Sequence, residues 1–150
     1  MNLSELIHRG GVIESCEGSS AEEIYRNVIA GMSFPSGISN EVIFNAVCSR
    51  ERIMSTAVGN GVALPHARIP VIRENEDQRV CVIYPKNPVS MNAPDERKVS
   101  VMFMILTQNQ QTHLDVLSKL VTLLQKAQFK KLLEKHAGEA ELLNMILNLS

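Results

Sequence analysis

Hydrophobic positions in the first third of the chain recur at the period of an amphipathic helix. Ser20 followed by Glu23 predicts a helix start, because each side chain can accept a hydrogen bond from the backbone amide of the other residue. Apolar residues then mark one face of the predicted helix, and the turn residues of 34–37 end it. The residues on this face are Ile24, Val28 and Met32.

A second amphipathic helix is predicted immediately afterwards. It is expected to begin at Ser39, which is a good capping residue, and to stop near Arg50. Helical spacing gives the residues that we expect to face inward, and these are Val42, Ile43, Ala46 and Val47.

The middle of the chain has the pattern of β-strands. Residues 79–84 form a short run rich in β-branched residues that Pro85 closes, and residues 99–106 are almost wholly apolar beyond Ser100. A run of the second kind is typical of a central strand covered on both faces. A further short strand, Val62–Pro65, is predicted after the glycine turn at 59–61.

The last third returns to a helical pattern. We expect Thr112 to cap a long helix, a short helix to follow around Phe129–Leu133, and a last helix to begin after Gly138. The predicted inward face of the long helix holds Leu114, Leu117, Leu120, Val121 and Leu124. Helices, then strands, then helices predict one α/β domain over residues 1–150, a three-layer sandwich whose mixed central β-sheet has helices on both faces.

Composition excludes several classes of protein. The hydrophobic fraction is 45%, the charged fraction is 21% and the net charge is −1, so the basic surface needed for nucleic acid is absent. The chain has no apolar run long enough to span a membrane and no secretory signal at its N-terminus. We therefore expect a cytoplasmic protein with no nucleic-acid partner and no membrane insertion.

The cysteines fit the same interpretation. There are three of them, Cys16, Cys48 and Cys81, far apart and without a CxxC motif. We expect them to be small hydrophobic residues of a reducing compartment. A Cys–His nucleophile pair is disfavoured because Cys48 and Cys81 fall in apolar stripes.

His66 is the first candidate for chemistry. Pro65 has no amide proton and suits the place where a strand stops pairing, so the histidine that follows is presented at a strand end, with Arg68 two residues further on. A histidine that follows a strand is more often a surface residue with no catalytic or binding role. If the ring acts through one nitrogen, the other needs an acceptor that fixes the tautomer, and the sequence does not identify one.

Two further residues are expected near His66. His113 follows the predicted cap Thr112, where free backbone amides favour an anion, and Arg50 stands at the end of the second helix. Such a set suits a phosphoryl group that a neutral imidazole attacks while cations and amides hold its oxygens. The alternatives are a histidine that merely neighbours a cap and an arginine that is solvated. No HxH or HExxH pattern is present, so we expect no metal and no cofactor.

The sequence resembles a known family over about residues 3–148. The run 49–68, SRERIMSTAVGNGVALPHAR, and a second match at Thr112-His113-Leu114 with Leu117 are similar to the IIA domain of the bacterial phosphoenolpyruvate-dependent phosphotransferase system, fructose–mannitol class (EIIA type 2). The resemblance implies that His66 is phosphorylated and that Arg50 and His113 surround it. The glycine turn and the free-standing length are most like the nitrogen-regulatory branch of the family.

The resemblance implies a function and leaves an alternative. The expected protein is a phosphocarrier that accepts a phosphoryl group on His66 from an HPr-like carrier and regulates a target protein according to its phosphorylation state. The alternative is the IIA component of a fructose- or mannitol-type transporter, which passes the group to a IIB domain. A non-phosphorylated binding module with the same fold is disfavoured, because His66, Arg50 and His113 are all present.

Overall fold

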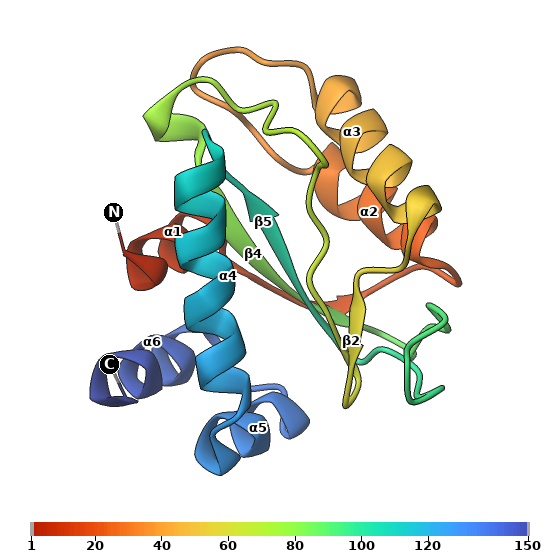
Figure 1. The fold of residues 1–150 in the computed structure, drawn as a ribbon, viewed down its shortest axis with the longest axis vertical. Helices are drawn as coiled ribbons and strands as arrows, with labels where there is room; N and C mark the ends of the chain where they lie inside the picture. Colours follow the sequence, from red (N-terminus) through yellow and green to blue (C-terminus); the bar gives the residue numbers. More distant parts are fainter. Residues whose placement is uncertain (1, 150) are drawn as a thin grey trace.

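A five-stranded sheet forms the middle layer of the protein (Figure 1). The computed structural model describes residues 2–149 and places the strands in the order β1-β4-β5-β3-β2. Their bounds are Val12–Cys16 for β1, Ala57–Gly59 for β2, Val62–Ala63 for β3, Arg79–Pro85 for β4 and Val101–Leu106 for β5. β1 is parallel to β4 and β3 to β5, whereas β4–β5 and β2–β3 are antiparallel. The predicted mixed sheet is therefore confirmed.

Helices cover both faces of this sheet, as predicted (Figure 1). Two of them, α2 (Ala21–Ala30) and α3 (Asn40–Ile53), lie on one face. Those on the other face are α1 (Leu3–Gly10), α4 (Gln110–Leu124), α5 (Ala127–Glu134) and α6 (Glu139–Leu149). None of the helices in residues 2–149 is long and apolar enough to cross a membrane.

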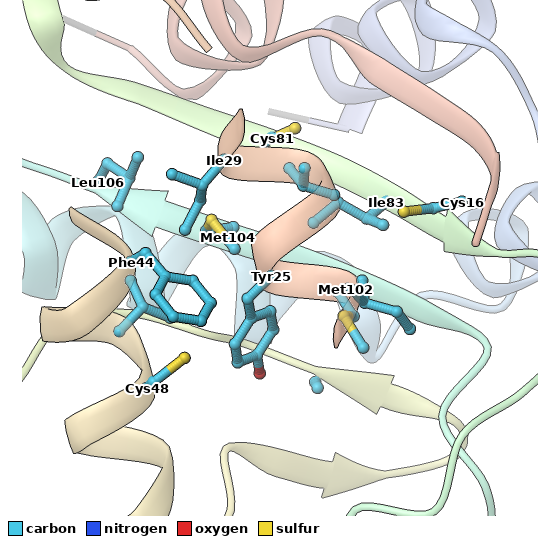
Figure 2. Close-up of a cluster of buried hydrophobic side chains, with 14 of the residues drawn as sticks. Cys16, Tyr25, Ile29, Phe44, Cys48, Cys81, Ile83, Met102, Met104 and Leu106 are labelled. Carbon is cyan, nitrogen blue, oxygen red and sulfur yellow. The ribbon is translucent and has the colours of Figure 1, made fainter. Parts of the chain in front are cut away.

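Alternating residues of the two central strands supply both cores. On β4, Cys81 and Ile83 face α2 and α3, while Val80, Val82 and Tyr84 face the other helices. Every residue of β4 and β5 is buried, and apart from Arg79 at the start of β4 all of them are apolar, as expected of strands covered on both faces. Figure 2 shows the first core, where side chains of α2 and α3 meet the inner face of the sheet. The three cysteines are free and buried, as expected.

The two helices that carry candidate residues differ in detail from the prediction. α3 does not stop near Arg50 but continues to Ile53, so Arg50 stands inside its last turn. Val42, expected to face inward, is 47% exposed. The cap of α4 is Asn109 rather than Thr112, because the Asn109 side chain accepts the Thr112 amide hydrogen bond.

The buried stripe of α4 is also rotated from the predicted one. Leu114 and Val121 are 56% and 44% exposed, and the fully buried residues are Val116, Leu120 and Leu123. The helix has two apolar stripes, and only one of them can face the sheet. Leu117 and Leu124 lie at the margin and are partly buried.

Four short elements of residues 2–149 were not predicted from the pattern: α1, β1, β2 and the 3₁₀-helix η1 (Asn75–Asp77). Each is brief, and β1 is half-exposed along most of its length, so hydrophobic periodicity gives a weak signal. α1 buries Leu3, Leu6 and Ile7, and its last residue, Gly10, lies directly against the backbone of β4.

We predict that Gly10→Ala destabilises the protein. A methyl group at this position would come within 2.1 Å of the Val80 carbonyl oxygen, which is backbone and cannot move aside alone. The free energy of unfolding, measured by urea denaturation, should fall by about 1–3 kcal/mol. Gly31→Ala is the control, because its methyl group would have only ordinary contact at 3.7 Å. Equal stability of the two variants would contradict this packing.

Candidate active site

His66 lies where the β3 segment ends beside the carboxyl end of β5. Its backbone forms a parallel bridge with Ile105, and the Ile105 amide donates to the Pro65 carbonyl oxygen at 2.8 Å. β5 then leads through a short loop into α4, which carries His113. In α/β sheets, the carboxyl ends of neighbouring parallel strands are a common place for a binding site. β3 itself covers only Val62–Ala63, two residues fewer than the predicted strand, but the bridge to Ile105 keeps His66 at the edge where the strand was expected to end.

One nitrogen of the His66 ring is fixed by the backbone. Nδ1 lies 2.7 Å from the Leu64 carbonyl oxygen. A carbonyl oxygen only accepts, so Nδ1 carries the proton and the Nε2 lone pair is free. Leu64 is therefore the acceptor that the sequence did not identify.

Burial keeps the His66 ring neutral at neutral pH. Desolvation lowers the pKa of His66 below 6.5, and the nearby Arg50 guanidinium lowers it further. The hydrogen bond to Leu64 and the carboxylate of Glu51 act in the opposite direction. A neutral ring with a free Nε2 is a nucleophile.

His113 stands next to this ring. The centroids of the His66 and His113 rings are 4.6 Å apart, and their planes are inclined at 45°. Burial lowers the pKa of His113, and the charge that His66 would carry if protonated lowers it further. A small hollow includes both rings in its lining, together with Pro70, Ile72 and Gln110.

The start of α4 is held firmly beside the hollow. The buried Gln78 side chain accepts the Gln108 amide at 2.8 Å, and Asn109 then caps the helix. The His113 amide, which would be free at a first helical position, donates instead to the Asn109 carbonyl oxygen at 3.1 Å. Of the first-turn amides, those of Gln110 and Gln111 are left outside the helical hydrogen bonds. They are the amides that could bind an anion here.

Arg50 approaches the site from α3. Its guanidinium donates to the Met54 carbonyl oxygen at 2.5 Å, and its charge acts on His66. The structure thus brings Arg50, His66 and His113 together from three separate parts of the chain. Arg68, in contrast, is exposed.

Glu51 is a candidate that the residue pattern did not single out. Its carboxylate accepts hydrogen bonds from the Tyr25 hydroxyl at 2.6 Å, the Thr56 amide at 2.7 Å and the Thr56 hydroxyl at 2.6 Å. In the sequence, only its position beside Arg50 pointed to Glu51. A glutamate near a helix end is usually solvated, so the pattern gave no reason to select it.

Several large apolar side chains near the site are exposed to solvent. Ile69 follows His66 by three residues and is 69% exposed, and Leu114, next to His113, is 56% exposed. At the end of α3, Ile53 and Met54 are 64% and 69% exposed. We call these four residues the apolar rim. Exposed apolar side chains beside a candidate site are the residues from which a protein-binding surface can be built.

No metal-binding cluster accompanies these residues. Within residues 2–149, no group of three or more His, Cys, Asp or Glu side chains is arranged to hold a metal ion. The chemistry that the described geometry supports is nucleophilic attack by Nε2 on an electrophile whose negative oxygens Arg50 and the α4 amides can bind.

Comparison with known proteins places the chain in a family. Residues 6–149 match the family described as "Phosphoenolpyruvate-dependent sugar phosphotransferase system, EIIA 2". The protein therefore belongs to the type-2 EIIA family of the phosphotransferase system, and the resemblance seen in the sequence is confirmed.

Nitrogen regulatory proteins are among the relatives. The chain is 33% identical over 86 residues to one from Klebsiella oxytoca, a match that covers 55% of this chain and 51% of that protein. It thus spans about half the length of the first curated relatives. A nitrogen regulatory protein of Pseudomonas aeruginosa is 25% identical over 98% of this chain and 95% of its own length. The crystal structure of nitrogen regulatory protein IIA-Ntr from Neisseria meningitidis superposes with a TM-score of 0.81 at 26% identity, covering 95% and 97% of the two chains.

Sugar-transport proteins also match. The fructose-specific EIIABC component of Bacillus subtilis is 24% identical over 97% of this chain but only 23% of that protein. The complex of enzyme IIA-mannitol with phosphorylated enzyme IIB-mannitol from Escherichia coli contains a neighbour with a TM-score of 0.65 at 18% identity, covering 91% and 95% of the two chains. That likeness shows a shared fold, and in that structure the partner of the IIA fold is a IIB protein.

We predict that both site histidines titrate below 6.5, because burial disfavours their charged forms. In His66→Ala, the pKa of His113 should rise, since a neighbouring positive charge and part of the burial are removed. NMR titration of the ring C–H signals measures both values. Unperturbed pKa values for both rings, or no response of His113 to the substitution, would contradict this geometry.

Proposed function

We propose that the protein is a phosphocarrier of the nitrogen-regulatory branch of the phosphotransferase system. In this proposal, Nε2 of His66 accepts a phosphoryl group from the phosphohistidine of an HPr-like carrier protein. The phosphorylated and unphosphorylated forms then bind a regulatory target differently. The observation that carries the proposal is the fixed tautomer of His66, with Nδ1 bonded to Leu64 and Nε2 free beside Arg50 and His113.

Each neighbour has a role in the proposed transfer. Arg50 and the first-turn amides of α4 bind the phosphoryl oxygens, over which negative charge spreads as the group moves. The incoming charge raises the pKa of His113, which then donates a hydrogen bond or a proton to those oxygens. Neither role requires a metal or a cofactor. The protein would work in the cytoplasm.

The regulatory form of the proposal rests on the relatives. The Pseudomonas and Neisseria proteins that match almost the whole chain are nitrogen regulatory proteins. The alternative is a transport role, in which a IIB domain takes the phosphoryl group from His66. The fructose-specific relative and the IIA–IIB complex favour this alternative.

We expect phosphoenolpyruvate and the two upstream carriers to label His66. The label should be lost in acid and survive base, as a phosphoramidate does, and should be absent in His66→Ala. Because only the neutral ring can attack, the initial rate should fall as the pH drops through the lowered pKa of His66, below 6.5. Intact-protein mass spectrometry measures the label. A labelled His66→Ala variant would exclude the assignment.

We expect Arg50→Ala and His113→Ala to slow phosphoryl transfer by about 10²–10³-fold, the usual value of an electrostatic donor in a transition state. Arg50→Lys should restore only part of the rate, because lysine lacks the planar two-pronged donor. Quenched time courses measure the rate of phosphoryl transfer. Urea denaturation shows whether each variant keeps its folding stability. The matched control is Arg52→Ala, whose side chain instead pairs with Glu22 on the outer surface. Wild-type rates in both site variants would show that these residues are ordinary surface groups.

We expect the carrier protein to dock on the apolar rim and the neighbouring loops. Ala67, Ile69, Pro70 and residues 108–111 flank the site, and the interface of such a transient complex is small, below about 1,200 Å². Amide shifts on adding the carrier should gather there, and Leu114→Ala should weaken binding. The control is Leu147→Ala, since Leu147 is 66% exposed on the distant α6. Shifts confined to α6 would refute this surface.

Partner binding separates the two candidate functions. Phosphorylation adds about −1.5 to −2 charges to the site, which is enough to make or break a weak complex. A regulator should therefore recover different partners in its unmodified and phosphorylated forms, and His66→Ala should behave as the unmodified form. Rapid removal of the phosphoryl group by a purified IIB domain, with no partner that distinguishes the two forms, would favour transport.

A further inference from the structure

A continuous chain of hydrogen bonds joins the Glu51 carboxylate to the ring of His66. Glu51 accepts the amide and the hydroxyl of Thr56 at 2.7 and 2.6 Å. The Thr56 carbonyl oxygen accepts the Leu64 amide at 3.0 Å, and the Leu64 carbonyl oxygen accepts Nδ1–H of His66 at 2.7 Å. All of these bonds run in the same sense, from His66 toward Glu51, and the backbones of Thr56 and Leu64 link them. Glu51 therefore holds Thr56 in place, Thr56 holds Leu64, and Leu64 holds the His66 ring.

The carboxylate at the start of the chain is rigidly placed. Tyr25 has no exposed surface, and its hydroxyl donates to Glu51 at 2.6 Å. Figure 2 shows the Tyr25 ring descending from α2 with its hydroxyl at the edge of the core cluster. Thr56 is only 5% exposed. With donors from two elements on its two oxygens, the carboxylate has little freedom to turn away.

The proposed phosphoryl transfer creates a charge that this arrangement can stabilise. The Nε2 lone pair forms the new N–P bond while the N–P bond of the donor's phosphohistidine breaks, and that electron pair returns to the donor's ring nitrogen. The Nδ1 proton stays on His66. The ring of His66 therefore acquires one positive charge as the donor's ring loses one. Arg50 opposes a positive ring, whereas Glu51 favours it.

We propose that Glu51 is a positioning residue for His66, which holds the Thr56–Leu64 hydrogen-bonded segment behind the ring and stabilises the positive charge that the ring gains when Nε2 takes a phosphoryl group. Arg50 and Glu51 then act on different groups in the same transfer. The arginine binds the phosphoryl oxygens, and the glutamate supports the ring through the backbone. This inference rests on the proposed function, but the titration described next tests the ring without any transfer.

The test compares Glu51→Gln with variants that keep the charge. In Glu51→Gln, NMR titration should give a lower pKa for His66 than in the wild type, and phosphoryl transfer should slow by roughly 10–100-fold, as when a carboxylate behind a functional histidine is removed. Tyr25→Phe removes a hydrogen bond from the same carboxylate but keeps its charge, so the pKa of His66 should not fall. Glu41→Gln removes an exposed carboxylate from the first turn of the same helix and should change neither value.

Every outcome bears on the proposal. A His66 pKa that is unchanged in Glu51→Gln overturns it, even if transfer slows, because a purely structural glutamate would alter the rate through folding alone. A pKa that falls equally in Tyr25→Phe also overturns it. If Glu51→Gln does not fold, Glu51→Asp draws the carboxylate back from Thr56 by one methylene group. A lowered His66 pKa in that variant supports the proposal, and an unchanged one overturns it. A wild type that is never phosphorylated on His66 refutes the proposed function, while the titration still decides whether Glu51 supports the ring.

Discussion

The parallel pairing of β3 with β5 is the constraint on which the site depends. Because the two strands run in the same direction, their carboxyl ends lie at the same edge of the sheet, and the segments that follow them start side by side. One segment is His66 itself, bridged to Ile105, and the other is the loop that opens α4. An antiparallel pairing would separate the two histidines by the length of a strand. The 4.6 Å between their rings is a consequence of strand direction.

Burial and charge act against each other on His66. Desolvation and Arg50 keep the ring neutral, so its lone pair is available, whereas the Leu64 carbonyl and Glu51 prepare the ring for a positive charge. A nucleophile that becomes cationic needs both influences, since the first decides whether it can attack and the second how well it carries the product's charge. The neighbouring residues Arg50 and Glu51 on α3 supply one influence each. Two adjacent residues of one helix thus have opposite effects on the charge of the His66 ring.

The surroundings of the site are suited to a protein partner rather than to a small molecule. The hollow that both rings line is small, and exposed apolar side chains lie close to the two histidines in the chain, Ile69 after His66 and Leu114 after His113. In the proposed transfer, a phosphohistidine on a partner has to reach Nε2 from outside, so the nucleophile must stand at an accessible edge. The core beneath is rigid, with β4 and β5 buried on both faces.

The sequence by itself determined the layers of the fold and singled out His66, His113 and Arg50 as the residues to examine. The apolar runs of β4 and β5, the amphipathic helices and the strand end at Pro65–His66 are local patterns, which a sequence records within one short segment. Tertiary structure decided which stripe of α4 faces the sheet, where α3 ends, and that Asn109 caps α4. It also selected Leu64 as the acceptor of Nδ1–H and brought the Glu51 carboxylate to Thr56. These features depend on contacts between segments distant in the chain, such as Tyr25 with Glu51, and no periodicity within one segment records such a contact.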